Sequence, residues 1–425
     1  MAAFSRYSHV GMRFQNSGNC VRSSRTHKLK NHLWRFRNEK SLKSILCAFL
    51  AASAMLSLAA CGTSSGGSTA SGAASTPAGS SGGAVYELAV VTDANSIDDR
   101  GFNQGAWEGL AKYAEENNIT HQYYRPIDQS TDGYLVAIES AVNNGAKLVV
   151  CPGYLFEAAV YKAQDMYPDV SFIILDGTPQ DGTYTDYKTA DNTYSIVFAE
   201  EQAGFLAGYA AVKDGYRDLG FFGAMAVPSV VRYGYGYLQG AEYAARELGL
   251  EPGAVSCKYH YTGTFDILPE NQTKAASWYQ SGTQCIFGCG TPDNVFAACE
   301  SVGGDCVAIG VDLDQSASSE TVLTSAMKNL SVAVYDGITM FYNGEFPGGV
   351  NARLDIKDNA VGLPMETSRF KNFTQADYDA IAAKMAADED GVVSGMVKDV
   401  DESGNSIDLE TLVSGLSLVN VEVIN

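Results

Sequence analysis

Acidic residues follow several short apolar runs of the sequence, at points where a strand would end. Asp93 and Asp176 each follow one such run, and Asp312 and Asp314 follow a third. Carboxylates accept hydrogen bonds from a ligand, and a pair of them can act as general acid and base. Because Asp is also a turn former and a helix cap, the recurrence carries more weight than any single position.

The elements that would position these acids alternate between two patterns from residue 85 onward. Apolar runs rich in Val, Ile and Phe predict strands at 86–91, 147–151, 170–175, 219–222, 254–259, 284–287, 306–311 and 321–326. Amphipathic stretches predict helices at 104–117, 156–166, 201–212 and 237–248. This alternation predicts an α/β fold with doubly wound parallel sheets, in which ligands bind beyond the carboxyl ends of the strands.

Glycine and aromatic residues accompany the acids at the expected strand ends. They lie at 152–154 in the first half of the chain and at 223–225, 262–266 and 288–290 in the second. The strand ends form two groups on either side of about residue 196. Two such groups facing each other would form a cleft between two lobes, for which the chain is long enough.

The charge balance restricts the class of ligand. Residues 61–425 contain 19 Lys and Arg against 48 Asp and Glu, a formal charge of −29. A surface of this sign repels phosphate backbones and anionic lipid head groups, so we expect no nucleic-acid partner. A neutral or cationic ligand is easier to accept than a polyanion.

The cysteines could form a metal site only at an unusual spacing. Four of them fall within 22 residues, at Cys285, Cys289, Cys299 and Cys306. Structural zinc sites use two tight pairs, whereas the gaps here are three, nine and six residues. We expect buried thiols or one disulfide such as Cys299–Cys306, and no metal or cofactor. The scarcity of histidine after residue 60 points the same way, since only His121 and His260 remain.

The segment before Cys61 carries an export pattern. Lys40 and Lys43 precede an apolar run at 45–60, shorter than the ~20 residues that a membrane span needs. The run ends in Leu58-Ala59-Ala60-Cys61-Gly62, which resembles the lipobox of bacterial lipoproteins. That resemblance implies cleavage before Cys61 and a diacylglycerol anchor on its sulfur. A plain signal peptide, or a chance cysteine, is the alternative interpretation.

The remaining N-terminal residues divide into two parts. Residues 1–60 are expected to be the signal peptide with an extension, since 1–39 are basic, polar and aperiodic. A start codon assigned too early would explain that extension, with Met12 one internal candidate. Residues 62–83 contain only Gly, Ser, Thr, Ala and Pro, which predicts a flexible tether with a reach of about 25 Å after the lipidated cysteine.

Several segments together resemble the basic membrane protein family of ABC-transporter solute-binding lipoproteins, whose relatives include purine nucleoside receptors. The most specific is 91–104, an Asp-rich loop leading to Gly101-Phe102-Asn103-Gln104, where Ser is usual in place of Gly101. The other segments are 200–208, 309–315 and 323–328. They occur in the family's order from about Tyr86 to about Gly362, and little of the last 60 residues matches.

The resemblance implies a type I periplasmic-binding-protein-like fold, in which two lobes joined by hinge crossovers close on a ligand. The first lobe would comprise 84–195 and about 329–365, and the second 196–328 and about 366–425. By motif position, Phe102 and Phe265 resemble the aromatic pair that sandwiches a nucleobase. The expected polar contacts to base edges are Asp93, Asn103 and Asp176. The expected ribose contacts are Asp312 and Lys328, with Tyr233 a further candidate in a loop after Phe222.

Each of these residues also has a purely structural interpretation. Phe102 could pack on its own helix as a hydrophobic staple, while Asp98 and Asp99 could cap that helix. Phe265 could be ordinary core, and Lys328 a solvated surface lysine.

The sequence thus predicts a lipid-anchored protein on the extracytoplasmic face of the cell membrane, which captures nucleosides, expected to be purines, for an ABC permease. We expect no enzymatic activity, because the sequence carries no nucleophile elbow, phosphate loop or dinucleotide fingerprint. Asp314 is expected to point away from Asp312, which disfavours a carboxylate pair. The alternatives are a receptor for a pentose or signalling sugar, and a nucleoside hydrolase that holds calcium at its Asp-rich strand ends.

Overall fold

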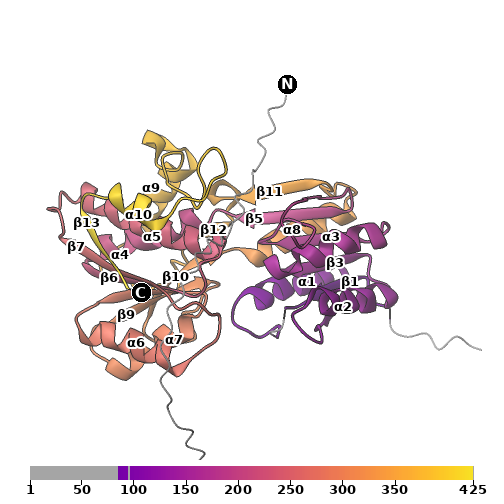
Figure 1. Ribbon diagram of the computed structural model, residues 1–425, viewed down its shortest axis with the longest axis horizontal. Helices are drawn as coiled ribbons and strands as arrows, with labels where there is room; N and C mark the ends of the chain where they lie inside the picture. The colour runs from indigo at the N-terminus through magenta and orange to yellow at the C-terminus, as the bar shows by residue number, and fades with distance from the viewer. Residues whose placement is uncertain (1–84, 94–95, 425) are drawn as a thin grey trace, which may run out of the picture. The chain divides into compact units, whose positions relative to one another are not determined.

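The computed structural model describes residues 85–93 and 96–424. The predicted signal peptide at 1–60, the lipidated Cys61 and the tether to residue 83 lie outside the described residues. The described chain forms two β-sheets, each with helices packed on both of its faces (Figure 1). Within the described ranges, no helix is long and apolar enough to cross a membrane.

The first sheet is entirely parallel and has the strand order β11-β5-β4-β3-β1-β2. Its strands are β1 (Leu88–Val91), β2 (His121–Tyr124), β3 (Leu148–Pro152), β4 (Ser171–Leu175), β5 (Thr193–Phe198) and β11 (Val350–Leu354). Leu88 and Val90 face a core shared with α1 (Phe102–Asn117) and α8 (Leu330–Tyr342). Ala89 and Val91 face the opposite core, shared with α2 (Thr131–Asn143), η1 (Tyr154–Phe156) and α3 (Glu157–Met166).

The second sheet has the order β12-β10-β9-β8-β6-β7-β13 and is parallel except for the pairing of β12 with β10. Its strands are β6 (Asp218–Gly223), β7 (Val255–Tyr261), β8 (Cys285–Cys289), β9 (Val307–Asp312), β10 (Val322–Lys328), β12 (Val361–Gly362) and β13 (Val419–Val423). Two cores flank it, one with α4 (Glu200–Asp214) and α5 (Pro228–Glu247), the other with α6 (Pro269–Gln280) and α7 (Pro292–Val302). The later elements are η2 (Ile356–Asp358), α9 (Gln375–Ala386), η3 (Glu389–Gly391) and α10 (Leu409–Ser414).

The chain crosses between the two sheets after β5, after β10 and before β12. The crossovers are tied together, since Asn329 N–H donates to Ala360 O at 2.8 Å and Ala199 N–H to Leu354 O at 2.9 Å. The last residue of the first sheet before the first crossover is Phe198, and the first residue of the second sheet after the last crossover is Val361. The lobe boundaries expected from the sequence, at 195 and about 365, lie a few residues from these positions.

The prediction that Tyr233 lies in a loop is wrong, because α5 begins at Pro228 rather than near Tyr237. Proline suits the first turn of a helix, where its missing N–H has no partner to lose. The alternating Tyr and Gly at 233–237 lower the helix propensity of this stretch, which is why the sequence pattern favoured a loop.

Glycines let α4 and α5 approach each other backbone to backbone. Gly204 and Gly208 on α4 face carbonyl oxygens of α5, and Gly236 and Gly240 on α5 face carbonyl oxygens of α4. A Cβ atom at any of the four positions would overlap one of those oxygens. Tertiary packing therefore compensates for the low helix propensity of glycine here, and it fixes α5 relative to the start of α4.

The six cysteines of the described residues are free thiols. Cys299 and Cys306 lie side by side with their sulfurs 2.8 Å apart, unbonded, so the structure does not contain the disulfide considered for this pair. Across residues 85–93 and 96–424, no group of three or more His, Cys, Asp or Glu side chains could hold a metal ion.

Gly240→Ala should destabilise the protein by about 1–3 kcal/mol, because the added methyl group forces α4 and α5 apart. Urea unfolding of both proteins measures the difference. An unfolding free energy unchanged from wild type would contradict the proposed close approach of the two helices.

Candidate functional site

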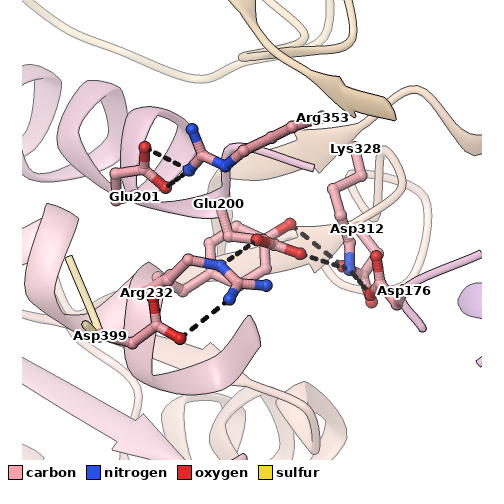
Figure 2. A network of polar contacts seen from close by, with 9 residues as sticks. Asp176, Glu200, Glu201, Arg232, Asp312, Lys328, Arg353 and Asp399 are labelled. Atoms are coloured by element: carbon pink, nitrogen blue, oxygen red, sulfur yellow. Dashed lines mark hydrogen bonds and ion pairs between the residues drawn. The ribbon is translucent and has the colours of Figure 1, made fainter. Parts of the chain in front are cut away.

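Lys328 stands at the carboxyl end of β10, where the chain leaves the second sheet, and its side chain is only 3% exposed. Its Nζ forms an ion pair with Asp176, which follows β4 of the first sheet. The same Nζ lies 3.4 Å from Oδ1 of Asp312, at the end of β9, and 3.5 Å from Oε1 of Glu200, the first residue of α4 (Figure 2). The ammonium therefore joins acids at the strand ends of both sheets.

Aromatic rings surround the same ammonium. Its Nζ lies 4.9 Å from the ring centre of Phe102 on α1, 5.6 Å from that of Tyr233 and 5.8 Å from that of Phe198. Tyr233 also donates a hydrogen bond of 3.1 Å from its hydroxyl to Asp312 Oδ1. A cation close to ring faces is stabilised most where water is excluded, as it is here. The interpretation of Lys328 as a solvated surface lysine is therefore wrong.

The ionisation of the group follows from burial and mutual attraction. Burial lowers the pKa of Lys328, but the neighbouring Asp176, Asp312 and Glu200 outweigh it and raise that pKa above the usual value. Burial raises the pKa of Glu200, yet Arg232 and Lys328 bring it below its usual value. For Asp176 burial prevails, and it raises the pKa of that carboxyl to about 6 despite the contact with Lys328.

Asp176 and Asp312 both occupy the left-handed backbone region, with φ of 54° and 66°. This conformation is uncommon for residues other than glycine and is found repeatedly at ligand sites. Oδ2 of Asp176 contacts Lys328, whereas its buried Oδ1 has no hydrogen-bond partner among the described residues. A buried carboxylate oxygen without a partner is costly, so this atom is an acceptor suited to a donor supplied by a ligand.

The loop before α1 forms a second polar group. Asn103 is buried, and its Nδ2 donates to Asp93 Oδ1 at 2.9 Å and to Asp99 Oδ2 at 2.8 Å. Asp99 also accepts from the backbone N–H groups of Gly101, Asn103 and Gln104 at 2.9–3.1 Å, so it caps the helix. These bonds fix the start of α1, and with it the ring of Phe102.

Gln315 links this loop to the second sheet. Its Nε2 donates to the carbonyl oxygen of Arg100 at 3.1 Å, while its Oε1 accepts from the N–H of Val311 on β9 at 2.9 Å. The buried amide side chain thus joins the loop before α1 to the end of β9.

Phe265 stands apart from these contacts. It lies in the loop after β7, is 43% exposed and covers Gly290 at the end of β8. Between the described side chains of Phe102 and Phe265 there is no direct ring contact, and two rings that hold a base between them would not touch each other, so their pairing around a ligand stays a prediction. An exposure of 43% also rules out the interpretation of Phe265 as ordinary core.

Sequence reasoning missed the second layer of the site. Glu200 is fully buried and receives a 2.6 Å hydrogen bond from Nε of Arg232, whose Nη1 lies 3.0 Å from Oδ2 of Asp399. The neighbouring Glu201 binds Arg353 of β11 at 2.6 Å. Two adjacent glutamates at a helix start suggest ordinary first-turn acids. Their complete burial follows from the packing of α4, which the sequence does not reveal.

Comparisons with known proteins identify relatives of the chain. Residues 86–390 match the Bmp family, described as ABC transporter substrate-binding protein PnrA-like. The chain is 30% identical over 325 residues to the ABC transporter nucleoside-binding protein BmpA of Lactococcus lactis, covering 70% of this chain and 88% of that protein. It is 29% identical over 276 residues to basic membrane protein B of Borreliella burgdorferi, covering 63% and 78%.

The fold resembles that of a solved structure. The solute-binding protein of an ABC transporter system from Aeropyrum pernix superposes with a TM-score of 0.59 at 23% identity, covering 77% of this chain and 96% of that one. This likeness confirms the predicted fold class, two parallel-sheet α/β lobes of the type I periplasmic-binding-protein kind.

Lys328→Met should destabilise the protein by about 3–5 kcal/mol, because it leaves buried carboxylates without their cation. Lys147→Met is the matched control, since Lys147 is mostly exposed and its surface ion pair with Glu87 contributes at most about 1 kcal/mol. Urea unfolding at pH 7 compares the two variants with wild type. Equal small losses would contradict a central role for the buried ammonium.

Proposed function

Because the chain belongs to the Bmp family of PnrA-like ABC transporter substrate-binding proteins, we propose that its ligand is a nucleoside, with purines preferred. The observation that carries this proposal is the cluster of Lys328 with Phe102, Asp176 and Asp312, here called the Lys328 group. It combines an aromatic face at Phe102, hydrogen-bond acceptors at Asp176 and Asp312, and a buried cation. A molecule that is flat and aromatic at one end and polyhydroxylated at the other would complement that set.

The base would stack on Phe102, with Phe265 closing over its other face. Stacking on aromatic side chains contributes roughly 1–3 kcal/mol per base, and Phe265 is exposed in a loop from which it could reach a ligand. Asn103 directly follows Phe102, Asp93 is hydrogen-bonded to Asn103, and the two would meet the polar edge of the base. Their mutual hydrogen bonds hold them ready for that contact.

The ribose would bind at Asp312 and Lys328. The Asp312 carboxylate can accept protons from two vicinal hydroxyls, and the Lys328 ammonium can donate to a hydroxyl oxygen. Tyr233 positions Asp312 through its hydroxyl, and Oδ1 of Asp176 offers the unused acceptor. A ligand without matching donors would leave these buried groups unpaired, which favours ribonucleosides over deoxyribonucleosides.

Capture would proceed without chemical change to the ligand. Closure of the two lobes would be driven by the higher affinity of the closed state, and the closed form would be delivered to a membrane permease. The lipobox-like sequence ending at Cys61 supports a lipid anchor that holds the protein on the extracytoplasmic face of the cell membrane.

Calorimetry with adenosine, guanosine, inosine, uridine and ribose tests the proposal. We expect binding of at least one purine nucleoside, and Phe102→Ala should weaken it by about tenfold or more through lost stacking. Heat with ribose but with none of the nucleosides would replace the proposal with a pentose receptor. Unchanged affinity in Phe102→Ala, with thermal stability preserved, would remove the assigned role of that ring.

A further inference from the structure

One face of α5 is occupied by residues 391–424, here called the C-terminal segment, which begins where the match to the family ends. Side chains at three- and four-residue spacing along α5 each bind it, and they are Arg232, Tyr235, Gln239 and Glu242. Positions with this spacing share one face of a helix. The segment ends in β13, which extends the second sheet beside β7 (Figure 1).

Most of these contacts only attach the segment to the helix. Tyr235 donates to the carbonyl oxygen of Ile407 at 2.9 Å. Gln239 exchanges two hydrogen bonds with the backbone of Val397, at 2.9 and 2.7 Å. Glu242 accepts from the backbone N–H groups of Leu418 and Val419 at 2.8 and 3.0 Å. None of these three helix residues contacts the Lys328 group.

Arg232 differs because it connects the segment to the ligand site. Its Nη1 binds Asp399 at 3.0 Å and its Nε binds Glu200 at 2.6 Å, and Oε1 of Glu200 lies 3.5 Å from Nζ of Lys328 (Figure 2). The side chains of Asp399 and Arg232 are 16% and 14% exposed. Contacts between charges with so little exposure are weakly screened by solvent, so they can act from one to the next.

We infer that Asp399 is a positioning residue, which holds Lys328 in place through Arg232 and Glu200 and thereby lets the C-terminal segment set the affinity of the ligand site. The inference rests on the proposed function for the identity of the ligand. Its structural basis is the unbroken line of ion pairs from Asp399 to Lys328.

Loss of the Asp399 charge would redistribute these contacts. Among the described residues Arg232 would keep Glu200 as its ion-pair partner and would attract it more strongly, at the expense of the longer contact between Glu200 and Lys328. The ammonium would then depend on Asp176 and Asp312 alone, and its position relative to a bound ligand would change. Mutations along such networks change the coupling between sites by roughly 2- to 30-fold in affinity without touching the ligand.

The charge near Asp176 would change as well. The groups that act on its carboxyl are Lys328, Glu200, Asp312, Arg232 and Tyr233. Removal of the negative charge of Asp399 makes the surroundings of Asp176 less negative, and this favours the ionised form of the Asp176 carboxyl. The pKa of Asp176, about 6 in the wild type, should therefore fall.

Asp399→Asn tests the inference, with Gln239→Ala as the control that loosens the same segment without removing a charge. In calorimetry with the tightest nucleoside, Asp399→Asn should bind at least about threefold more weakly, and Gln239→Ala within about twofold of wild type. Carbon-detected NMR titration of the Asp carboxyls without ligand should show a lower Asp176 pKa in Asp399→Asn only. Asp399→Ser replaces Asp399→Asn if the latter does not fold.

Unchanged affinity and unchanged Asp176 titration in Asp399→Asn would overturn the inference. The inference would also be overturned if Gln239→Ala weakened nucleoside binding as much as Asp399→Asn and neither variant shifted the Asp176 pKa. The C-terminal segment would then affect the site through its attachment to α5 and not through the charge of Asp399. If the wild type binds no nucleoside, the proposed function fails separately, and the titration in the ligand-free protein still decides whether Asp399 acts on the site.

Discussion

A buried ammonium among three carboxylates is the interaction on which the rest of the site depends. Lys328 has almost no access to water, and its charge is balanced by Asp176, Asp312 and Glu200. Burial of an unpaired charge would be prohibitive, so the four groups must be brought together whenever the protein folds. They come from strand ends of both sheets and from a crossover. The two sheets must therefore be joined in a way that lets these charges pair.

The packing of α4 against α5 supplies the support for that arrangement. Glycines on both helices allow backbone contact, and this places Glu200 at the start of α4 beside Arg232 on α5. Glu201, the next residue, binds Arg353 of the first sheet. Two neighbouring glutamates thus point to different partners, Glu200 to Lys328 and Arg232, and Glu201 to Arg353. The burial of Glu200 beside Arg232 therefore depends on the close packing of α4 against α5.

The sequence allowed the sheets and the strand-end acids to be predicted, because apolar runs covered on both faces are a local signal. It also singled out Phe102, Asp176, Asp312 and Lys328, which the structure brings into one group, although their roles toward a ligand stay predictions. It could not reveal that Tyr233 lies in a helix, since the glycines beside it weaken helix propensity and are compensated only by contact with α4. Glu200 and Asp399 were missed for a similar reason. Their partners are far away in the sequence, and although Glu200 opens one of the family-like segments, nothing local shows that either side chain is buried.

The most direct test is a crystal structure of the protein with a bound purine nucleoside. The proposed binding mode predicts a base against the ring of Phe102, a ribose hydroxyl within hydrogen-bond distance of Asp312 or Lys328, and a ligand donor on Oδ1 of Asp176. A nucleoside bound elsewhere, with the Lys328 group left without any ligand contact, would contradict it.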